Sequence, residues 1–131
     1  MTPLTFRRYV LAASLVLLAT TLAVSPAPSP DPALLARAKS AFTELEHGRV
    51  DRAALTASVN AEYPDAMLEK TKTFFGPLGA PVAWKQAKYG TEDGGRFASY
   101  LMTFADGRRF ALLFGVDAQG KIDVMTFFPF S

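Results

Sequence analysis

The spacing of apolar residues changes at Pro81, and this change constrains the fold more than any other feature of the chain. Before Pro81, apolar residues recur at the spacing of an amphipathic helix. After Pro81, they follow the two-residue period of a β-strand. Helices followed by strands predict an α+β domain in which the helices pack on one face of a sheet.

Three helices are expected before Pro81. Asp31 suits the N-cap of the first helix, Pro32 its first turn and Gly48 its C-terminal cap. A second, short helix is expected to begin at Asp51, and a third near Pro64. The buried side of the first helix is expected to contain Leu34, Ala38, Ala41, Phe42 and Leu45, and that of the third Met67, Leu68, Thr71, Phe74 and Phe75.

Four strands are expected after Pro81. The connections between them are short and rich in turn residues, as at Asp106-Gly107, which is a strong signal for a tight hairpin. Short turns between consecutive strands predict a curved antiparallel meander. The expected strands span residues 82–89, 97–104, 108–116 and 122–128.

Both faces of this expected sheet are apolar. Tyr100 and Met102 fall on one face of the second strand, and Phe97 and Leu101 fall on the other. Leu113 likewise points away from the other large apolar residues of its strand. One apolar face covers the helices, so the other needs an inward-curved pocket, a second subunit or a partner protein.

We therefore expect a non-catalytic binding or interaction domain, with its second apolar face as the binding surface. Its occupant is a small apolar ligand, a twin subunit that makes a homodimer, or another exported protein. The candidate ligand or interface residues are apolar and aromatic residues of the strands, namely Trp84, Tyr100, Met102, Phe104, Leu113 and Phe127.

Residues 1–24 have the features of a secretory signal peptide. Arg7 and Arg8 form a positive start, and an uncharged apolar run of 15 residues follows from Val10 to Val24. Thr21 and Ala23 place small side chains where signal peptidase reads them. The run is shorter than the ~20 residues of a membrane-spanning helix. We expect cleavage, no stable membrane span afterwards, and a periplasmic or extracellular location.

The remaining chain divides into a Pro-rich spacer, residues 25–31, and one domain, residues 32–131. The whole chain has 14 Lys and Arg against 12 Asp and Glu. Two of the basic residues lie in the leader, which leaves 12 against 12 and no basic surface for nucleic acid. The absence of cysteine excludes disulfides, so stability depends on a packed core.

The sequence contains a series of turn and cap motifs, namely Gly48-Arg49-Val50-Asp51-Arg52, Leu55-Thr56, Gly76-Pro77-Leu78-Gly79-Ala80-Pro81, Gly94-Gly95, Phe104 with Gly107, Gly120-Lys121-Ile122 and Phe128-Pro129. These motifs resemble those of the NTF2-like (cystatin-like) accessory domains found beside exported serine hydrolases of the β-lactamase and penicillin-binding type. The resemblance covers residues 35–130. It implies a helix-and-meander fold, but this chain has no Ser-x-x-Lys nucleophile motif, so hydrolase activity does not carry over. It therefore implies a stand-alone accessory domain.

The alternative is a small enzyme of isomerase or hydrolase type, with a tyrosine and a carboxylate in an apolar cone. Tyr100, Tyr89 and Asp123 are the residues for such a site, with Trp84 lining it. Asp123 follows Ile122 and is expected to point outward into water as an edge charge. The single histidine, His47, suits the last turn of a helix. We expect no catalytic residue, no metal site and no cofactor.

Overall fold

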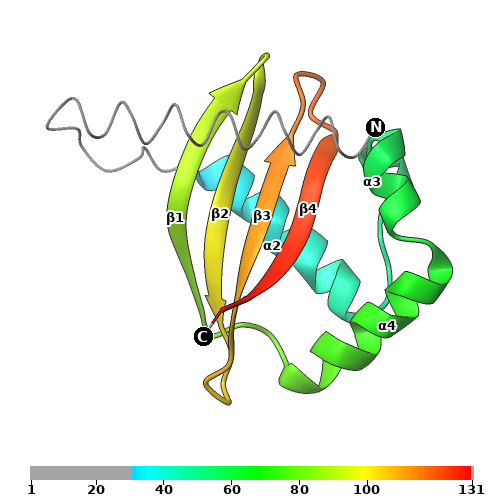
Figure 1. The fold of residues 1–131 in the computed structure, drawn as a ribbon, viewed down its shortest axis with the longest axis vertical. Helices are drawn as coiled ribbons and strands as arrows, with labels where there is room; N and C mark the ends of the chain where they lie inside the picture. Colours follow the sequence, from blue (N-terminus) through cyan, green and yellow to red (C-terminus); the bar gives the residue numbers. More distant parts are fainter. Residues whose placement is uncertain (1–30, 131) are drawn as a thin grey trace, which may run out of the picture.

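The structure is a computed structural model that describes residues 31–130. These residues form three α-helices, two short 3-10 helices and a four-stranded antiparallel sheet, with all helices before the strands (Figure 1). The expected α+β class is confirmed. The expected leader, residues 1–24, and nearly all of the expected spacer lie outside the described residues. Within residues 31–130, no helix has the length and apolar character needed to cross a membrane.

Helix α2 (Pro32–Glu46) begins and ends where local sequence signals predict. The Asp31 carboxylate accepts a hydrogen bond of 3.0 Å from the Leu34 N–H, which satisfies one of the free N–H groups at the helix start. Gly48 follows the last turn with a φ of 76°, a conformation that costs glycine little. The helix buries Leu34, Ala38, Phe42 and Leu45, and Ala41 is half-buried.

The single helix expected from Asp51 is divided into two pieces. Asp51 caps only a 3-10 turn, η1 (Arg52–Ala54), after which the chain becomes extended at Leu55. Leu55 forms a parallel bridge with Ile122 of the sheet, and this pairing interrupts the helix. Thr56 then caps α3 (Ala57–Glu62) by accepting a hydrogen bond from the Val59 N–H.

Helix α4 (Asp65–Phe75) runs into a 3-10 turn, η2 (Gly76–Leu78). It buries Leu68 and Phe75, as expected. Met67 and Phe74, however, are 40% and 47% exposed. The expectation that both are buried is wrong: α4 lies beyond the edge of the sheet (Figure 1), and of its large apolar residues only Leu68 and Phe75 are buried.

The sheet is a simple meander in the order β1-β2-β3-β4. Each neighbouring pair of strands is antiparallel, as expected. Asp93 and Gly94 both have positive φ, 52° and 81°, and they make a two-residue turn between the first two strands. The strands are β1 (Ala83–Glu92), β2 (Gly95–Thr103), β3 (Arg109–Val116) and β4 (Ile122–Phe130).

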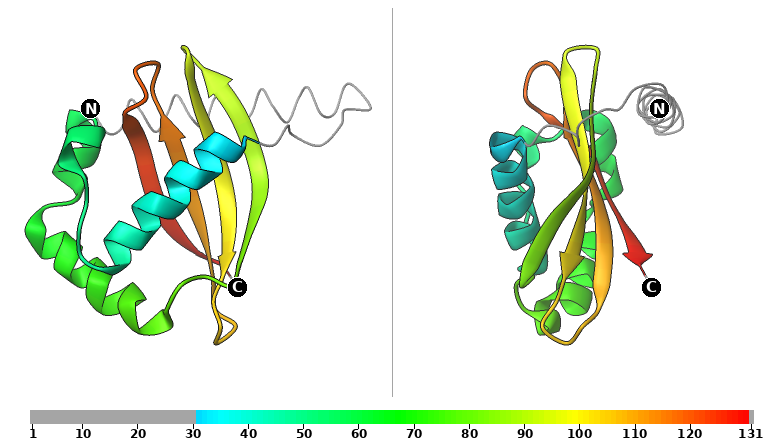
Figure 2. Two further views of the ribbon diagram at one scale, coloured as in Figure 1. Left: turned by 180° about the vertical axis from the view of Figure 1, so that it is seen from behind. Right: turned by 90° about the vertical axis from the view of Figure 1, so that its left-hand side faces the viewer.

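The core lies between α2 and one face of the sheet. Figure 2 shows α2 running diagonally across that face, and Figure 1 shows α3 beside β4 at the sheet edge. Phe42 of α2 stands at the centre of an aromatic cluster, with ring centroids 5.1 Å from Phe75, 6.0 Å from Trp84 and 5.9 Å from both Phe104 and Phe127.

Candidate functional site

The sheet face opposite α2 is the candidate binding surface, and we call it the outer face. No helix or strand of residues 31–130 crosses it (Figure 2). Residues Tyr100 and Leu112 are buried in the core, so by strand alternation their neighbours Leu101 and Leu113 belong to the outer face. The apolar residues that the register places on this face are Phe97, Leu101, Ala111, Leu113, Val124, Phe128 and Phe130.

Exposure is uneven along the outer face. Phe128 and Phe130 are 43% and 48% exposed, near the C-terminal end of β4. Phe97 is buried and forms a small cluster with Leu113 and Val124, separate from the main core. Its ring fills the space beside Gly90, where a Cβ atom would come within 2.6 Å of the ring. One end of the outer face is therefore closely packed, and the other presents open aromatic rings.

Three cations border this apolar surface. Lys85 pairs with Leu101 and Lys88 pairs with Ser99, and both partners belong to the outer face. In a regular strand, two residues three positions apart would point to opposite faces. A β-bulge between Gln86 and Lys88 brings both lysines to the outer face.

The third cation is Arg109, whose guanidinium carbon lies 4.9 Å from the centre of the Phe130 ring. Lys85, Lys88 and Arg109 are all exposed. The only acid that the register places on the outer face is Glu92, which pairs with Gly95 at the opposite end from Phe130. The outer face of the described chain therefore combines open aromatic rings with local positive charge.

Of the six candidate residues expected from the sequence, only Leu113 lies on the outer face. Tyr100, Met102 and Phe104 are at most 1% exposed and belong to the core under α2. Trp84 and Phe127 are partly buried and pack against the same core. These five residues therefore do not form an open binding surface. Alternation alone separates two faces but does not say which one meets the helices.

The open residues that were missed are mainly Phe128 and Phe130, together with Lys85 and Lys88. The adjacent pair Phe127-Phe128 did signal two opposite orientations, since neighbouring residues of a strand face opposite sides. The bulge that aligns the lysines has no comparable signal in the sequence.

A polar cluster lies at the start of α2. The second carboxylate oxygen of Asp31 accepts hydrogen bonds from the Tyr89 hydroxyl at 3.1 Å and from the Arg96 guanidinium at 2.9 Å. Partial burial by itself raises the pKa of Asp31, but the Leu34 N–H, Tyr89 and Arg96 together hold that pKa below 3.8. The contacts with Tyr89 of β1 and Arg96 of β2 anchor the start of α2 to the sheet.

Tyr100 lies near this cluster, but its hydroxyl is buried without a hydrogen-bond partner. Burial, followed by the nearby Asp31 charge, raises the pKa of Tyr100 to about 12. The space beneath the helices is filled by Phe42, Phe75 and Phe104. Tyr100 therefore lies in packed core, away from a cone into which a substrate could enter.

Asp123 and His47, the other two polar candidates, lie on different elements of the fold. Asp123 is 7% exposed, so the expectation that it points into water is wrong; it is the extra residue at the irregularity where β4 pairs with β3. The His47 Nδ1 lies 2.7 Å from the Thr43 carbonyl oxygen in the exposed last turn of α2. Within residues 31–130, no group of three or more His, Cys, Asp or Glu side chains is placed to hold a metal ion.

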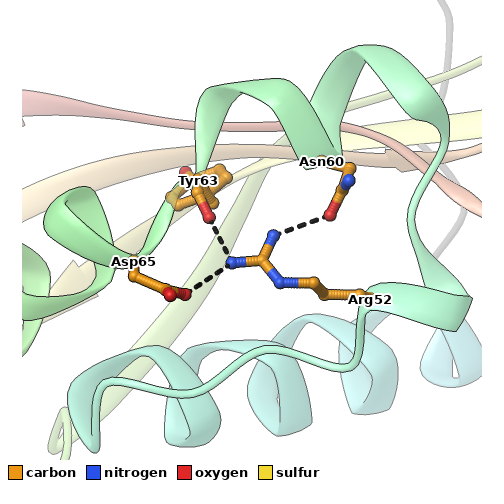
Figure 3. A network of polar contacts seen from close by, with 4 residues as sticks. All are labelled: Arg52, Asn60, Tyr63 and Asp65. Carbon is orange, nitrogen blue, oxygen red and sulfur yellow. Dashed lines mark hydrogen bonds and ion pairs between the residues drawn. The ribbon is translucent and has the colours of Figure 1, made fainter.

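Figure 3 shows the network of polar contacts around Arg52. Its guanidinium donates to Asn60 Oδ1 at 2.7 Å and to the Tyr63 carbonyl oxygen at 2.8 Å. It also pairs with Asp65 at 3.2 Å. These contacts join η1, α3 and the start of α4, so Arg52 fixes the helical segment in place.

A groove of about 770 Å³ separates α2 from residues 49–55. Leu55 and Ile122 lie among its lining residues, together with cations and acids of mixed sign such as Arg49 and Glu44. Arg37, also in the lining, already donates to the Gly120 carbonyl oxygen at 3.0 Å. The groove therefore offers no set of converging polar groups that would select a ligand.

No family model, no curated protein and no solved structure matches this chain. Its function is therefore inferred from its own surface and core.

Proposed function

We propose that this protein is an exported, non-catalytic interaction domain that binds its partner through the outer face. The observation that carries the proposal is a sheet face that no helix or strand of residues 31–130 covers, on which Phe128 and Phe130 are nearly half exposed. Contiguous exposed apolar surface on a domain is typical of a binding site. Most other large apolar residues of the described chain are buried in the core, although Met67, Phe74 and Val82 are also exposed.

The export part of the proposal rests on the sequence of residues 1–24, with its short apolar run after two arginines. Removal of that segment would release a periplasmic or extracellular domain. The turn motifs and the order of helices and strands support a stand-alone accessory domain of the NTF2-like (cystatin-like) kind.

A non-catalytic role is favoured over the enzymatic alternative by the position of Tyr100. A catalytic tyrosine must reach its substrate, whereas Tyr100 is 1% exposed and lies against Trp84 in the core. Asp31, whose charge acts on Tyr100, already caps α2 and anchors it to the sheet.

The test uses the absence of cysteine from the chain, so that one introduced thiol reports on one position. Phe128→Cys places the thiol on the outer face, and Phe74→Cys places a matched thiol on α4. The two phenylalanines are 43% and 47% exposed, so their intrinsic accessibility is similar. Labelling with a maleimide is compared between producing cells and the purified chain.

We expect the thiol at position 128 to be protected in cells and reactive after purification, while the thiol at position 74 reacts equally in both. Equal reactivity of the thiol at position 128 in cells and in the purified chain would show an uncovered face and refute the proposal.

A further inference from the structure

We infer that the partner presents an acidic amphipathic helix to the outer face. This inference rests on the proposed function and names the class of partner. It follows from the way in which charge and apolar surface are arranged across the sheet.

The positive charge of the outer face is local. Residues 31–130 contain 12 Lys and Arg and 12 Asp and Glu, so the domain as a whole is balanced. Three cations nevertheless lie on the outer face, Arg109 beside Phe130 and the two lysines, Lys85 and Lys88, on β1 across the sheet, and Glu92 lies at its far end. A partner with carboxylates beside its apolar side chains complements this surface in both respects.

A second copy of the chain fits poorly. A two-fold dimer through the outer face would bury the same patch from both subunits. Such a dimer would enclose six cations, three from each copy, and within residues 31–130 the register places no carboxylate in the open part of the face to pair with them. Like charges brought together at an interface oppose association.

The dimensions of the outer face match the width of a single helix. The two lysines lie on β1, and Phe128 and Phe130 lie on β4, at the opposite edge of the same sheet. Three strand spacings separate these edges, about 14 Å. One helix with its side chains is about 10–12 Å wide. A single helix lying along the sheet would therefore place an apolar side over β3 and β4 and an acidic flank over β1.

The experiment compares two synthetic helical peptides with identical apolar faces, one flanked by glutamates and the other by lysines. Binding to the chain from residue 28 onward, which contains every helix and strand described above, is followed by fluorescence anisotropy. We expect the acidic peptide to bind and the basic peptide to bind at least about tenfold more weakly, with added salt reducing the difference.

The lysines supply the charge test. The double variant Lys85→Glu/Lys88→Glu should weaken the acidic peptide about tenfold, since rim charges act through complementarity. The matched control, Lys70→Glu/Lys72→Glu, makes the same charge change on α4 and should leave binding unchanged. All four lysines are exposed, so neither double variant removes a core contact.

Equal binding of the two peptides, or binding of neither, overturns the inference. So does binding of the chain to phosphatidylglycerol vesicles without binding of the acidic peptide, which would assign the face to a membrane.

The proposed function is judged separately by the double variant Leu113→Ser/Phe128→Ser. The readout is the protection in cells of a thiol introduced at Leu101. If the serine changes abolish this protection and the lysine changes do not, the proposed interaction face stands and the acidic partner is refuted. If neither double variant affects protection, both fail.

Discussion

Tyr63 and Tyr100 are both buried, but their hydroxyl groups are in opposite situations. The Tyr63 hydroxyl donates a hydrogen bond of 2.6 Å to the Met125 carbonyl oxygen on the edge strand β4. The Tyr100 hydroxyl has no partner in the core. A buried polar group that is left unpaired loses its interactions with water without replacement.

Replacing each tyrosine with phenylalanine should therefore have different effects on stability. Tyr63→Phe should lower the free energy of unfolding by about 1–2 kcal/mol, because it removes a buried hydrogen bond and strands the carbonyl. Tyr100→Phe should leave it unchanged or raise it slightly. Urea unfolding measures both. An equal loss for the two variants would mean that the Tyr100 hydroxyl has a partner, such as an ordered water.

The Asp31 contacts predict a dependence of stability on pH. The pKa of Asp31 is lower in the folded chain than its ordinary value of 3.8. Its contribution to stability is therefore full above the unfolded-state pKa and is lost as the pH falls through the folded-state pKa. Asp31→Ala should cost about 1 kcal/mol at neutral pH through loss of the N-cap alone. The difference from the original chain should shrink below pH ~4. A difference that grows as the pH falls would contradict this account.

At the residue scale, the sequence predicts caps better than it predicts the site. Asp31 and Gly48 act within a few residues of themselves, so their roles are visible locally. The outward side of β2 is decided by α2, which is distant in the sequence. For that reason the sequence predicts Tyr100 and Leu113 in one binding surface, although the two residues lie on opposite faces of the sheet.

At the scale of elements, Arg52 determines how the helical segment is arranged. It bridges η1 to Asn60 and to the Tyr63 carbonyl oxygen, and its partner Asp65 is fully exposed (Figure 3). An exposed ion pair contributes little, whereas the bond to the half-buried end of α3 holds two elements together.

Arg52→Ala should lower the free energy of unfolding by about 1 kcal/mol. It should also speed hydrogen exchange of the α3 amides, because α3 loses its attachment to η1. Asp65→Ala should change stability by less than about 0.5 kcal/mol. If the two variants lose the same stability, the ion pair and not the carbonyl contact holds the segment.

The elements also show where sequence patterns stop being sufficient. The four strands and their order were predicted, because each turn is encoded by adjacent residues such as Asp106-Gly107. The break at Leu55 was not, because it depends on pairing with Ile122, far along the chain. The bulge after Gln86 also arises from pairing between strands. It moves Lys88 to the outer face, which a two-residue period does not predict.

At the scale of the whole molecule, the helices of residues 31–130 cover one sheet face, and our proposal assigns the other face to a partner. The charge on the outer face makes that partner different from the chain itself. Light scattering of the chain from residue 28 onward should therefore give the mass of a monomer. A dimer that dissociates when Phe128 is changed to serine would instead assign the outer face to self-association.

The most direct test of the central claim is photo-cross-linking in producing cells. A photoreactive phenylalanine analogue replaces Phe128 on the outer face in one strain and Phe74 on α4 in another. The account predicts a discrete cross-linked product from position 128, heavier than the chain and different from its dimer, and no such product from position 74. Cross-linking from position 74 alone would contradict it, since the partner would then contact the helical side of the molecule.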